Sequence, residues 1–201
     1  MRDLLDVLKR TERITKTGGT AVLATLVKVD GSAYRHAGAR MLIESDGQRT
    51  GFLSAGCLEA DLAIRAKEVF ESGQPRVVTY DTSGPEDIVW GLGLGCNGVL
   101  NILLERTDSP SVQRGLRFIG ACIRQRRPGV MATLVFSRED QQVRSRLCGL
   151  VPPDGTIELD VPGPFREPGA TTAAVRPTAI ATARPVADSK RARPFSSRSS
   201  R

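Results

Sequence analysis

Hydrophobic residues recur along the chain in two patterns, one with helical spacing and one in short, nearly continuous apolar runs. Apolar positions three or four residues apart predict helices, at residues 3–16, 58–72 and 111–125. Short apolar runs bounded by turn residues predict strands, at residues 21–29, 40–44, 49–53, 76–80, 99–105 and 130–136. Interspersed helices and strands predict an α/β fold, with α+β as the alternative, built as a compact mixed sheet with helices.

The hydrophobic pattern ends near residue 162. Proline, alanine, threonine, serine and arginine dominate residues 163–201, and a segment of this composition buries too little apolar surface to offset the entropy lost on ordering. We therefore expect one folded domain at residues 1–162 and a disordered basic tail at residues 163–201. No Gly-x-Gly-x-x-Gly motif lies directly between a predicted strand and a predicted helix, so a Rossmann domain is not expected.

A cysteine lies where the predicted hairpin gives way to a helix. Residues 54–61 read Ser-Ala-Gly-Cys-Leu-Glu-Ala-Asp, which predicts that Cys57 lies in the first turn of a helix, after Ser54 and Gly56. The first N–H groups of a helix lack internal acceptors and the helix dipole is positive there. Such a position favours a thiolate and binds anions. The alternative is a small side chain that is simply buried beneath the helix.

A second cysteine lies in a turn that is richer still in glycine. Residues 91–98 read Gly-Leu-Gly-Leu-Gly-Cys-Asn-Gly, so Cys96 stands between Gly95 and the pair Asn97 and Gly98. Glycines let backbone N–H groups approach a ligand closely, although a tight chain reversal alone also explains them. Two cysteines in two glycine-rich loops predict a site for a small anionic ligand with affinity for sulfur.

The net charge changes this picture little, because most of it lies in the tail. Residues 166–201 contain 8 of the 29 Lys and Arg residues and 2 of the 22 Asp and Glu residues, and so supply six of the seven net charges. The expected folded domain is nearly neutral, which argues against a basic groove for nucleic acid.

The cysteines and the N-terminus indicate the compartment. The four cysteines are widely spaced and none forms a Cys-x-x-Cys pair, which argues against structural zinc and against a thioredoxin-like site. Acidic residues interrupt the first apolar run, so no signal peptide is expected, and no run approaches the roughly 20 residues that span a bilayer. We expect a cytoplasmic protein with reduced thiols and no membrane partner.

Residues 31–41, Gly-Ser-Ala-Tyr-Arg-His-Ala-Gly-Ala-Arg-Met, form a third polar segment. Arg35 and Arg40 carry guanidinium groups that suit a phosphate, and Ser32, like Ser54, is able to hydrogen bond to a ligand. The alternatives are surface solubility for the arginines and turn capping for the serines. His36 is the only histidine, and no Ser/His/Asp set can be assembled around it.

Four of these segments together resemble one known family. Residues 19–27, 31–41, 54–59 and 91–98 resemble, in order and spacing, the N-terminal domain of the XdhC/CoxI family, and the resemblance covers residues 3–162. That family supplies accessory factors for xanthine dehydrogenase and related molybdenum hydroxylases. The resemblance implies a chaperone that binds the molybdopterin form of the molybdenum cofactor as cargo and delivers it, without enzymatic turnover. The implied partners are an apo molybdenum hydroxylase, a cysteine desulfurase and a second copy of the chain.

The resemblance also implies which residues hold the cargo. Cys57 and Cys96 are implied as ligands of molybdenum, which a soft thiolate suits. The implied cofactor-binding residues are Ser32, Arg35, Arg40, Ser54, Gly56, Cys57, Gly95, Cys96, Asn97 and Gly98.

The chain departs from the family pattern in three places. Tyr34 stands where the family often has proline, Ala55 stands where it often has glycine, and the Rossmann-like domain that usually follows is not found. Three other hypotheses therefore stay open: a cysteine-dependent enzyme that handles sulfur or phosphoryl groups, a protein that binds a partner or nucleic acid through its arginine-rich tail, and a truncated, non-functional family member.

Overall fold

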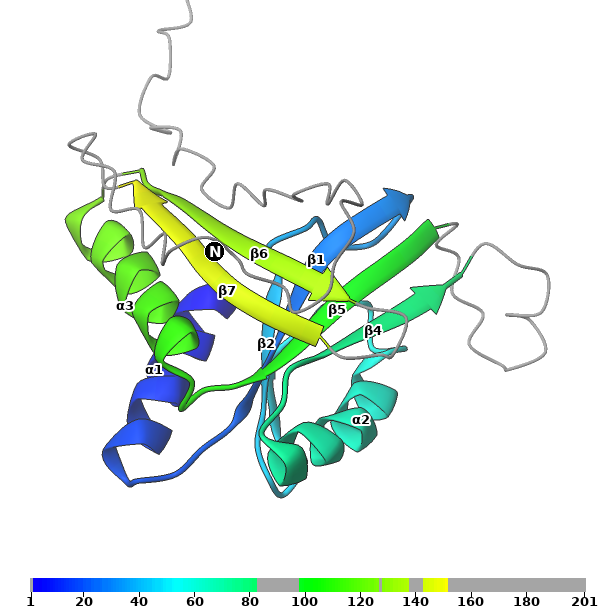
Figure 1. Cartoon of the computed structure of the whole chain (residues 1–201), viewed down its shortest axis with the longest axis horizontal. Coiled ribbons are helices and arrows are strands. Elements are labelled where there is room, and N and C mark those ends of the chain that lie inside the picture. Colours follow the sequence, from blue (N-terminus) through cyan, green and yellow to red (C-terminus); the bar gives the residue numbers. More distant parts are fainter. Residues whose placement is uncertain (1, 83–97, 127, 138–142, 152–201) are drawn as a thin grey trace, which may run out of the picture.

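The computed structural model describes residues 2–82, 98–126, 128–137 and 143–151, in three helices and seven strands (Figure 1). The predicted elements are confirmed to within about two residues, and one further strand, β7, completes them. The elements are α1 (Arg2–Lys16), β1 (Val22–Gly31), β2 (Arg40–Ile43), β3 (Arg49–Gly51), α2 (Glu59–Ser72), β4 (Arg76–Asp81), β5 (Gly98–Arg106), α3 (Pro110–Gln125), β6 (Val130–Ser137) and β7 (Val143–Val151). The predicted tail and the boundary at residue 162 lie outside the described residues.

Five strands form the main sheet, in the order β3-β2-β1-β5-β4. The fold class is as expected, but the expectation of a mixed sheet was wrong: all four strand pairs are antiparallel. Short loops join β1 to β2 and β2 to β3, and such connections permit only antiparallel neighbours. The long crossover through α2 joins β3 to β4, which lie at opposite edges of the sheet and therefore never pair.

The sheet is covered by α2 on one face and by α1 and α3 on the other (Figure 1). Successive residues of a strand point to opposite faces, and β1 is buried on both. Val22, Ala24 and Leu26 pack in one cluster with the apolar side of α2, whereas Leu23 packs with residues of α1, β2 and α3. The continuous apolar run of β1 is thus explained by its central position between two layers of helices.

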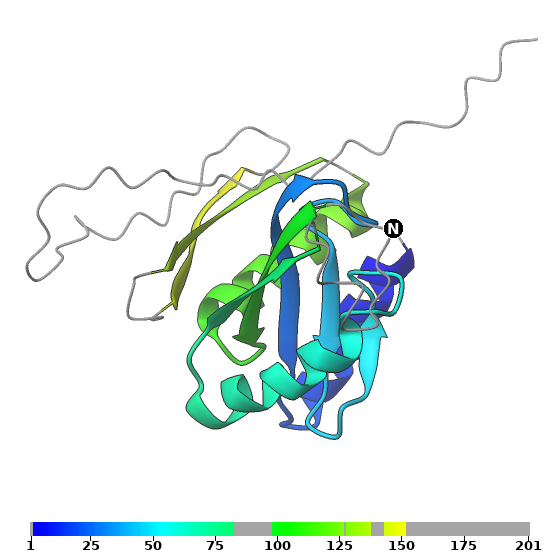
Figure 2. The same ribbon diagram turned by 90° about the vertical axis from the view of Figure 1, so that its right-hand side faces the viewer.

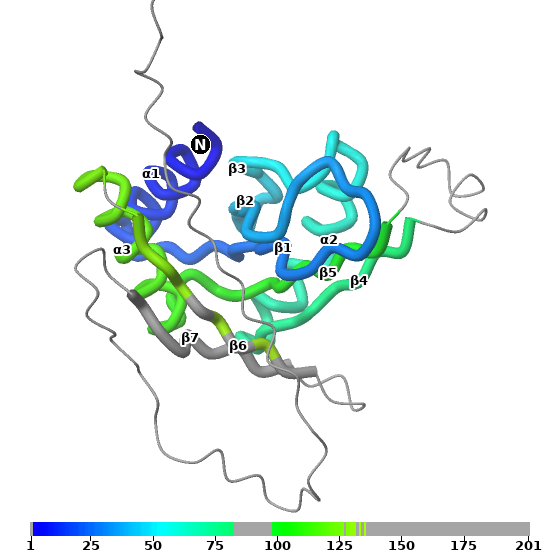
Figure 3. Tube along the Cα trace, turned by 90° about the horizontal axis from the view of Figure 1, so that it is seen from above, coloured from blue at the N-terminus to red at the C-terminus, as the bar shows by residue number. Residues whose placement is uncertain are grey.

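The strands β6 and β7 form a second, two-stranded sheet (Figure 2). Val135 of β6 packs against Val27 of β1 and Leu103 of β5, which are neighbouring strands of the main sheet (Figure 3). The β7 strand contacts α3 and β4.

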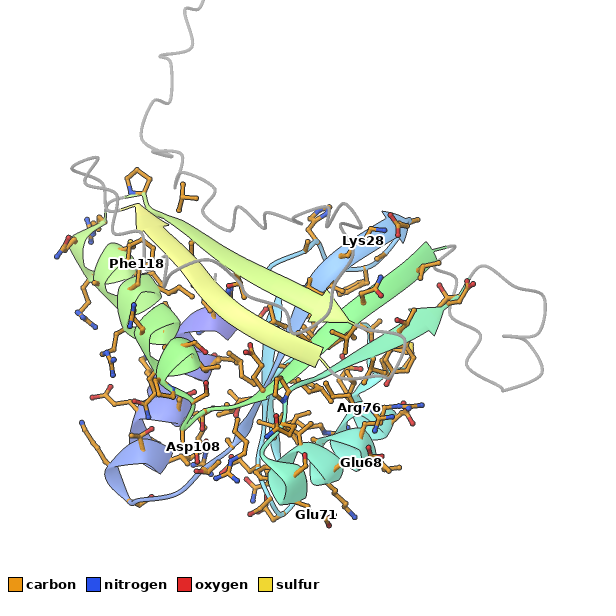
Figure 4. The ribbon with its side chains drawn as sticks, in the orientation of Figure 1. Lys28, Glu68, Glu71, Arg76, Asp108 and Phe118 are labelled. Carbon is orange, nitrogen blue, oxygen red and sulfur yellow. The ribbon has the colours of Figure 1, made fainter. Side chains whose placement is uncertain are left out.

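Gly129, directly before β6, lies against α3. A residue with a side chain would not fit there, since its Cβ would come within 2.6 Å of both the Cys122 sulfur and the Phe118 ring. Phe118 projects from α3 below the start of β6 (Figure 4).

Polar contacts fix α2 to the edge of the sheet. The Tyr80 hydroxyl on β4 donates to Asp61 Oδ2 over 2.5 Å, and Arg65 Nε donates to the same oxygen over 2.6 Å. Further along, Arg76 of β4 forms an ion pair with Glu68 of α2 (Figure 4). Asp61, in the first turn of α2, is therefore engaged in holding the helix in place.

The first prediction tests the burial of α2 with two residues of that helix. Leu62 is fully buried, whereas Ile64 is 64% exposed. Leu62→Ala leaves a cavity and should lower the free energy of unfolding by about 2–5 kcal/mol, while Ile64→Ala should change it by less than about 0.5 kcal/mol. Urea denaturation of both variants measures the difference, and equal losses would contradict this packing of α2.

Candidate functional site

The topology brings three loops to one end of the main sheet. β1, β3 and β4 run in one direction and β2 and β5 run against them, as their antiparallel registers require; the arrowheads of β1 and β4 point the same way in Figure 1. Residues 32–39, 52–58 and 82–97 therefore connect the strands at the same end, which we call the loop end. Of the third loop, only Thr82 is described.

Most of the predicted site residues that the structure describes belong to the loop end. Ser32 and Arg35 lie in the loop after β1, Ser54, Gly56 and Cys57 in the loop after β3, and Gly98 at the start of β5. The other three predicted residues of the second cysteine loop, Gly95, Cys96 and Asn97, lie outside the described residues. Whether the two cysteines meet therefore stays a prediction.

A buried carboxylate, that of Glu59, holds the turn that carries Cys57. Its Oε1 accepts hydrogen bonds from the backbone N–H of Leu53 at 2.9 Å and of Ser54 at 2.7 Å, and its Oε2 accepts from the Ser54 hydroxyl at 2.5 Å. Ser54 Oγ in turn accepts from the N–H of Leu58 at 3.1 Å and of Gly56 at 3.3 Å. Both ends of the turn are thus bound to each other through two side chains.

These hydrogen bonds also set the charge state of Glu59. Burial acts to raise the pKa of Glu59, but the hydrogen bonds from the Ser54 hydroxyl and from the N–H groups of Ser54 and Leu53 together stabilise the carboxylate more strongly, so the pKa lies below its usual value. The sequence offered little signal for this role. A capping box places Ser and Glu three residues apart, whereas Ser54 and Glu59 are five apart.

Cys57 itself lies just before the helix and not in its first turn, so that part of the prediction was wrong. α2 begins at Glu59 and its N-cap residue is Leu58. The chain is still turning at Gly56, whose φ of +110° is a conformation that side-chain-bearing residues rarely adopt. Cys57 is a free, partly exposed thiol. The turn therefore leaves Cys57 partly exposed, directly before the N-terminus of α2.

The loop after β1 contacts the loop after β3 through an aromatic and cationic cluster. The Tyr34 and Phe52 rings lie 6.2 Å apart between centroids and are tilted by 46°. The Arg35 guanidinium lies 4.6 Å from the centre of the Phe52 ring and forms an ion pair with Asp3 at 3.1 Å. The charge of Arg35, which was predicted to meet a phosphate, is thus paired within the protein.

Gly98 marks the point where the second cysteine loop rejoins the sheet. A Cβ at Gly98 would lie 2.6 Å from the carbonyl oxygen of Ser32 and 2.7 Å from that of Asp30. Thr82 Oγ1 donates to the Gly98 carbonyl at 2.7 Å and accepts from the Gly98 N–H at 3.2 Å. Glycine is required here by the neighbouring backbone, and the end of the second cysteine loop at Gly98 lies close to Ser32.

Arg40 lies at the start of β2, but its side chain is on the face of the sheet that α1 and α3 cover. It is buried, donates from Nη1 to the Gly38 carbonyl at 2.9 Å, and lines a cavity of about 40 Å³ together with Glu105 and Ser111. Burial lowers the pKa of Arg40 to about 10, against the opposing effect of Glu105. This position separates the guanidinium from the surface that presents Cys57.

Neither a metal site nor a membrane-spanning helix is found in the part of the chain that the structure describes. Those residues contain no group of three or more His, Cys, Asp or Glu side chains arranged to hold a metal ion. Their helices also include none that is long and apolar enough to cross a membrane.

The chain matches the model of one protein family and is similar in sequence to two proteins whose names refer to xanthine dehydrogenase or to the molybdenum cofactor. Residues 14–81 match the model of the XdhC and CoxI family. Over 86 residues the chain is 45% identical to a protein of Bacillus subtilis strain 168 that is named as a probable subunit of xanthine dehydrogenase, covering 43% of this chain and 26% of that protein. Over 143 residues it is 34% identical to the molybdenum cofactor insertion chaperone PaoD of Escherichia coli K12, covering 71% of this chain and 41% of that protein.

A solved structure extends the likeness beyond the matched segment. The crystal structure of a xanthine dehydrogenase from Bacillus halodurans superposes with a TM-score of 0.58 and 31% sequence identity, covering 78% of this chain and 45% of that one. The chain thus spans less than half the length of each of these proteins. The segment matched by the family model runs from the last turn of α1 to the end of β4 and includes the loop after β1 and the Cys57 turn. Within this chain, the likeness to the XdhC and CoxI family therefore lies in the segment that carries the loop after β1 and the Cys57 turn.

Proposed function

We propose that this chain is an accessory protein of a molybdenum hydroxylase of the xanthine dehydrogenase type, and that its loop end binds the molybdenum cofactor as cargo. The observation that carries the proposal is the free, partly exposed thiol of Cys57 on a turn braced by Glu59, inside the segment that matches the family. Similarity to a chaperone named for molybdenum cofactor insertion supports the same role. The expected receiver is an apo molybdenum hydroxylase, with a cysteine desulfurase and a second copy of the chain as further candidate partners.

The chemistry of the turn suits this cargo. The cofactor binds molybdenum through dithiolene sulfurs, and a cysteine thiolate is a ligand of the same soft character. Cys57 lies beside the N-terminus of α2, where the helix dipole favours an anion, and the cofactor carries a phosphate. Cys96 and its glycine-rich neighbours are proposed to complete the site from the second cysteine loop, with Ser32 at the base of that loop.

The described residues around Cys57 suit a cofactor carrier better than a cysteine-dependent enzyme. A catalytic cysteine needs a base within hydrogen-bonding reach. Glu59 is the carboxylate built into the Cys57 turn, and both of its oxygens are occupied by hydrogen bonds from Leu53 and Ser54. The carboxylate is thus committed to shaping the turn.

The second prediction concerns Cys57. When the full chain is mixed anaerobically with molybdenum cofactor and desalted, the wild type should retain molybdenum and pterin. Cys57→Ala should retain at least about tenfold less, since the metal loses a thiolate ligand, while its free energy of unfolding changes by less than about 1 kcal/mol. Metal analysis and pterin fluorescence of the desalted protein measure retention.

The matched control for this experiment is Cys122→Ala, which removes the free thiol of α3 and should retain cargo like the wild type. Retention by Cys57→Ala equal to that of the wild type would contradict the proposal. Multiple turnovers of a sulfur donor at Cys57 would instead favour the enzyme hypothesis.

The third prediction concerns the pH dependence of the Cys57 turn. The pKa of Glu59 is lowered in the folded protein, so its carboxylate contributes stability above the unfolded pKa of about 4.3, and this contribution is lost as pH falls through the folded pKa. Glu59→Gln should therefore lower the free energy of unfolding by about 1–3 kcal/mol at neutral pH, and the difference from the wild type should shrink as the solution is acidified below the unfolded pKa.

Urea denaturation at neutral and acidic pH provides the test. Glu71→Gln is the control, since Glu71 is an exposed residue of the same helix (Figure 4), and it should leave stability nearly unchanged at both pH values. A cost of Glu59→Gln that stays constant on acidification would show that the charge of Glu59 does not brace the turn.

A further inference from the structure

Exposed hydrophobic side chains are unevenly placed in the described part of the molecule. Three large ones stand out there: Tyr34 at 60% exposure, Ile64 at 64% and Val130 at 42%. Ile64 projects from α2, and Val130 begins β6. Tyr34 is the one among them that belongs to the loop end, and nothing in the proposed function so far uses it.

The Tyr34 ring is held in place from one side. Its contact with Phe52 at 6.2 Å fixes one side of the ring, and the Arg35 guanidinium 4.6 Å from the centre of the Phe52 ring supports Phe52 in turn. Arg35 is anchored on α1 by its ion pair with Asp3 at 3.1 Å. A tilted aromatic pair of this kind leaves much of the outer ring accessible to another flat group.

The loop that carries Tyr34 is also fixed at both ends. The Leu26 N–H donates to the Ala39 carbonyl at 2.9 Å, and the Gly38 N–H donates to the Leu26 carbonyl at 2.7 Å. Arg40 Nη1 donates to the Gly38 carbonyl at 2.9 Å, and at the other end Gly31 pairs with Gly98. A ring presented on a pre-ordered loop loses little conformational entropy when a ligand binds.

We infer that Tyr34 is a binding residue that stacks on the flat pterin ring of the cargo, an inference that rests on the proposed function. A pterin is a planar nitrogen heterocycle, and such rings stack on aromatic side chains. Phe52 contacts Tyr34 and precedes Cys57 by five residues, so the aromatic surface and the thiol belong to one connected piece of the loop end. The thiol is then the contact for the metal and Tyr34 the contact for the organic ring.

This assignment changes the role expected of Arg35. Its guanidinium is paired with Asp3 and lies against Phe52, so it supports the aromatic surface instead of meeting the phosphate. Specificity for a flat heterocycle comes from the ring of Tyr34, and its hydroxyl is not required.

The experiment titrates the full chain with 6-hydroxymethylpterin, a pterin without metal or phosphate, and follows quenching of pterin fluorescence. Tyr34→Ala should weaken binding about fivefold or more, while Tyr34→Phe should stay within about twofold of the wild type, because stacking needs only the ring. Ile64→Ala, which removes a similarly exposed side chain from α2, should bind the pterin like the wild type. Guanosine monophosphate should bind more weakly than the pterin.

A second measurement uses the intact cofactor and separates this inference from the proposed function. Release of retained pterin after desalting should be about fivefold or more faster from Tyr34→Ala than from the wild type, with Tyr34→Phe unchanged. If the wild type and Tyr34→Ala retain the cofactor equally well, the role of Tyr34 is overturned and the proposed function stands. If the wild type binds neither the cofactor nor the pterin, the proposed function and the role of Tyr34 are both overturned. Equal binding of guanosine monophosphate would overturn the assignment to pterin.

Discussion

The hydrogen bonds to the Glu59 carboxylate decide how the chain passes from the main sheet to the helix that covers it. One side chain at the start of α2 binds the two backbone N–H groups that follow β3, and Ser54 returns the connection to the N–H of Leu58. The carboxylate is buried and its hydrogen bonds are charge-assisted, so they are stronger than those between neutral groups. These bonds constrain residues 55–57 of the turn, where Cys57 is partly exposed.

The sheet then determines what surrounds that thiol. Because its neighbouring strands are all antiparallel, the loops after β1, β3 and β4 emerge at one end. The loop after β1 brings Tyr34 and Arg35 against Phe52, and the second cysteine loop rejoins the sheet at Gly98, beside Ser32. For the cargo that we propose, which combines a sulfur-bound metal, a flat ring and a phosphate, this end of the sheet offers a thiol, an aromatic ring and a helix N-terminus.

Much of this fold could be predicted from the sequence, because burial leaves a periodic trace. The apolar run of β1 and the apolar stripe of α3 predicted their elements within about two residues. β7 was missed: its Val143, Ser145 and Leu147 alternate with arginines, which weakens the apolar run. The local sequence does not show which strands pair. The antiparallel pairing of the sheet, and the burial of the Arg40 side chain on the face that α1 and α3 cover, could therefore not be predicted. Cys57 was predicted in the first turn of a helix because it follows a turn of small residues and precedes a helical run. The hydrogen bonds between Ser54 and Glu59 were not predicted, because a five-residue spacing is not a familiar capping pattern.

If the loop end binds the cargo as we propose, the Cys57 thiolate on the braced turn is a ligand of the molybdenum. X-ray absorption at the molybdenum edge of the anaerobic complex tests it most directly, because the amplitude of the sulfur shell reports the number of sulfur ligands. We expect a larger sulfur shell for the wild-type complex than for the free cofactor, and a smaller sulfur shell in cargo bound by Cys57→Ala than in the wild-type complex. The same sulfur shell in wild type and variant would contradict the account.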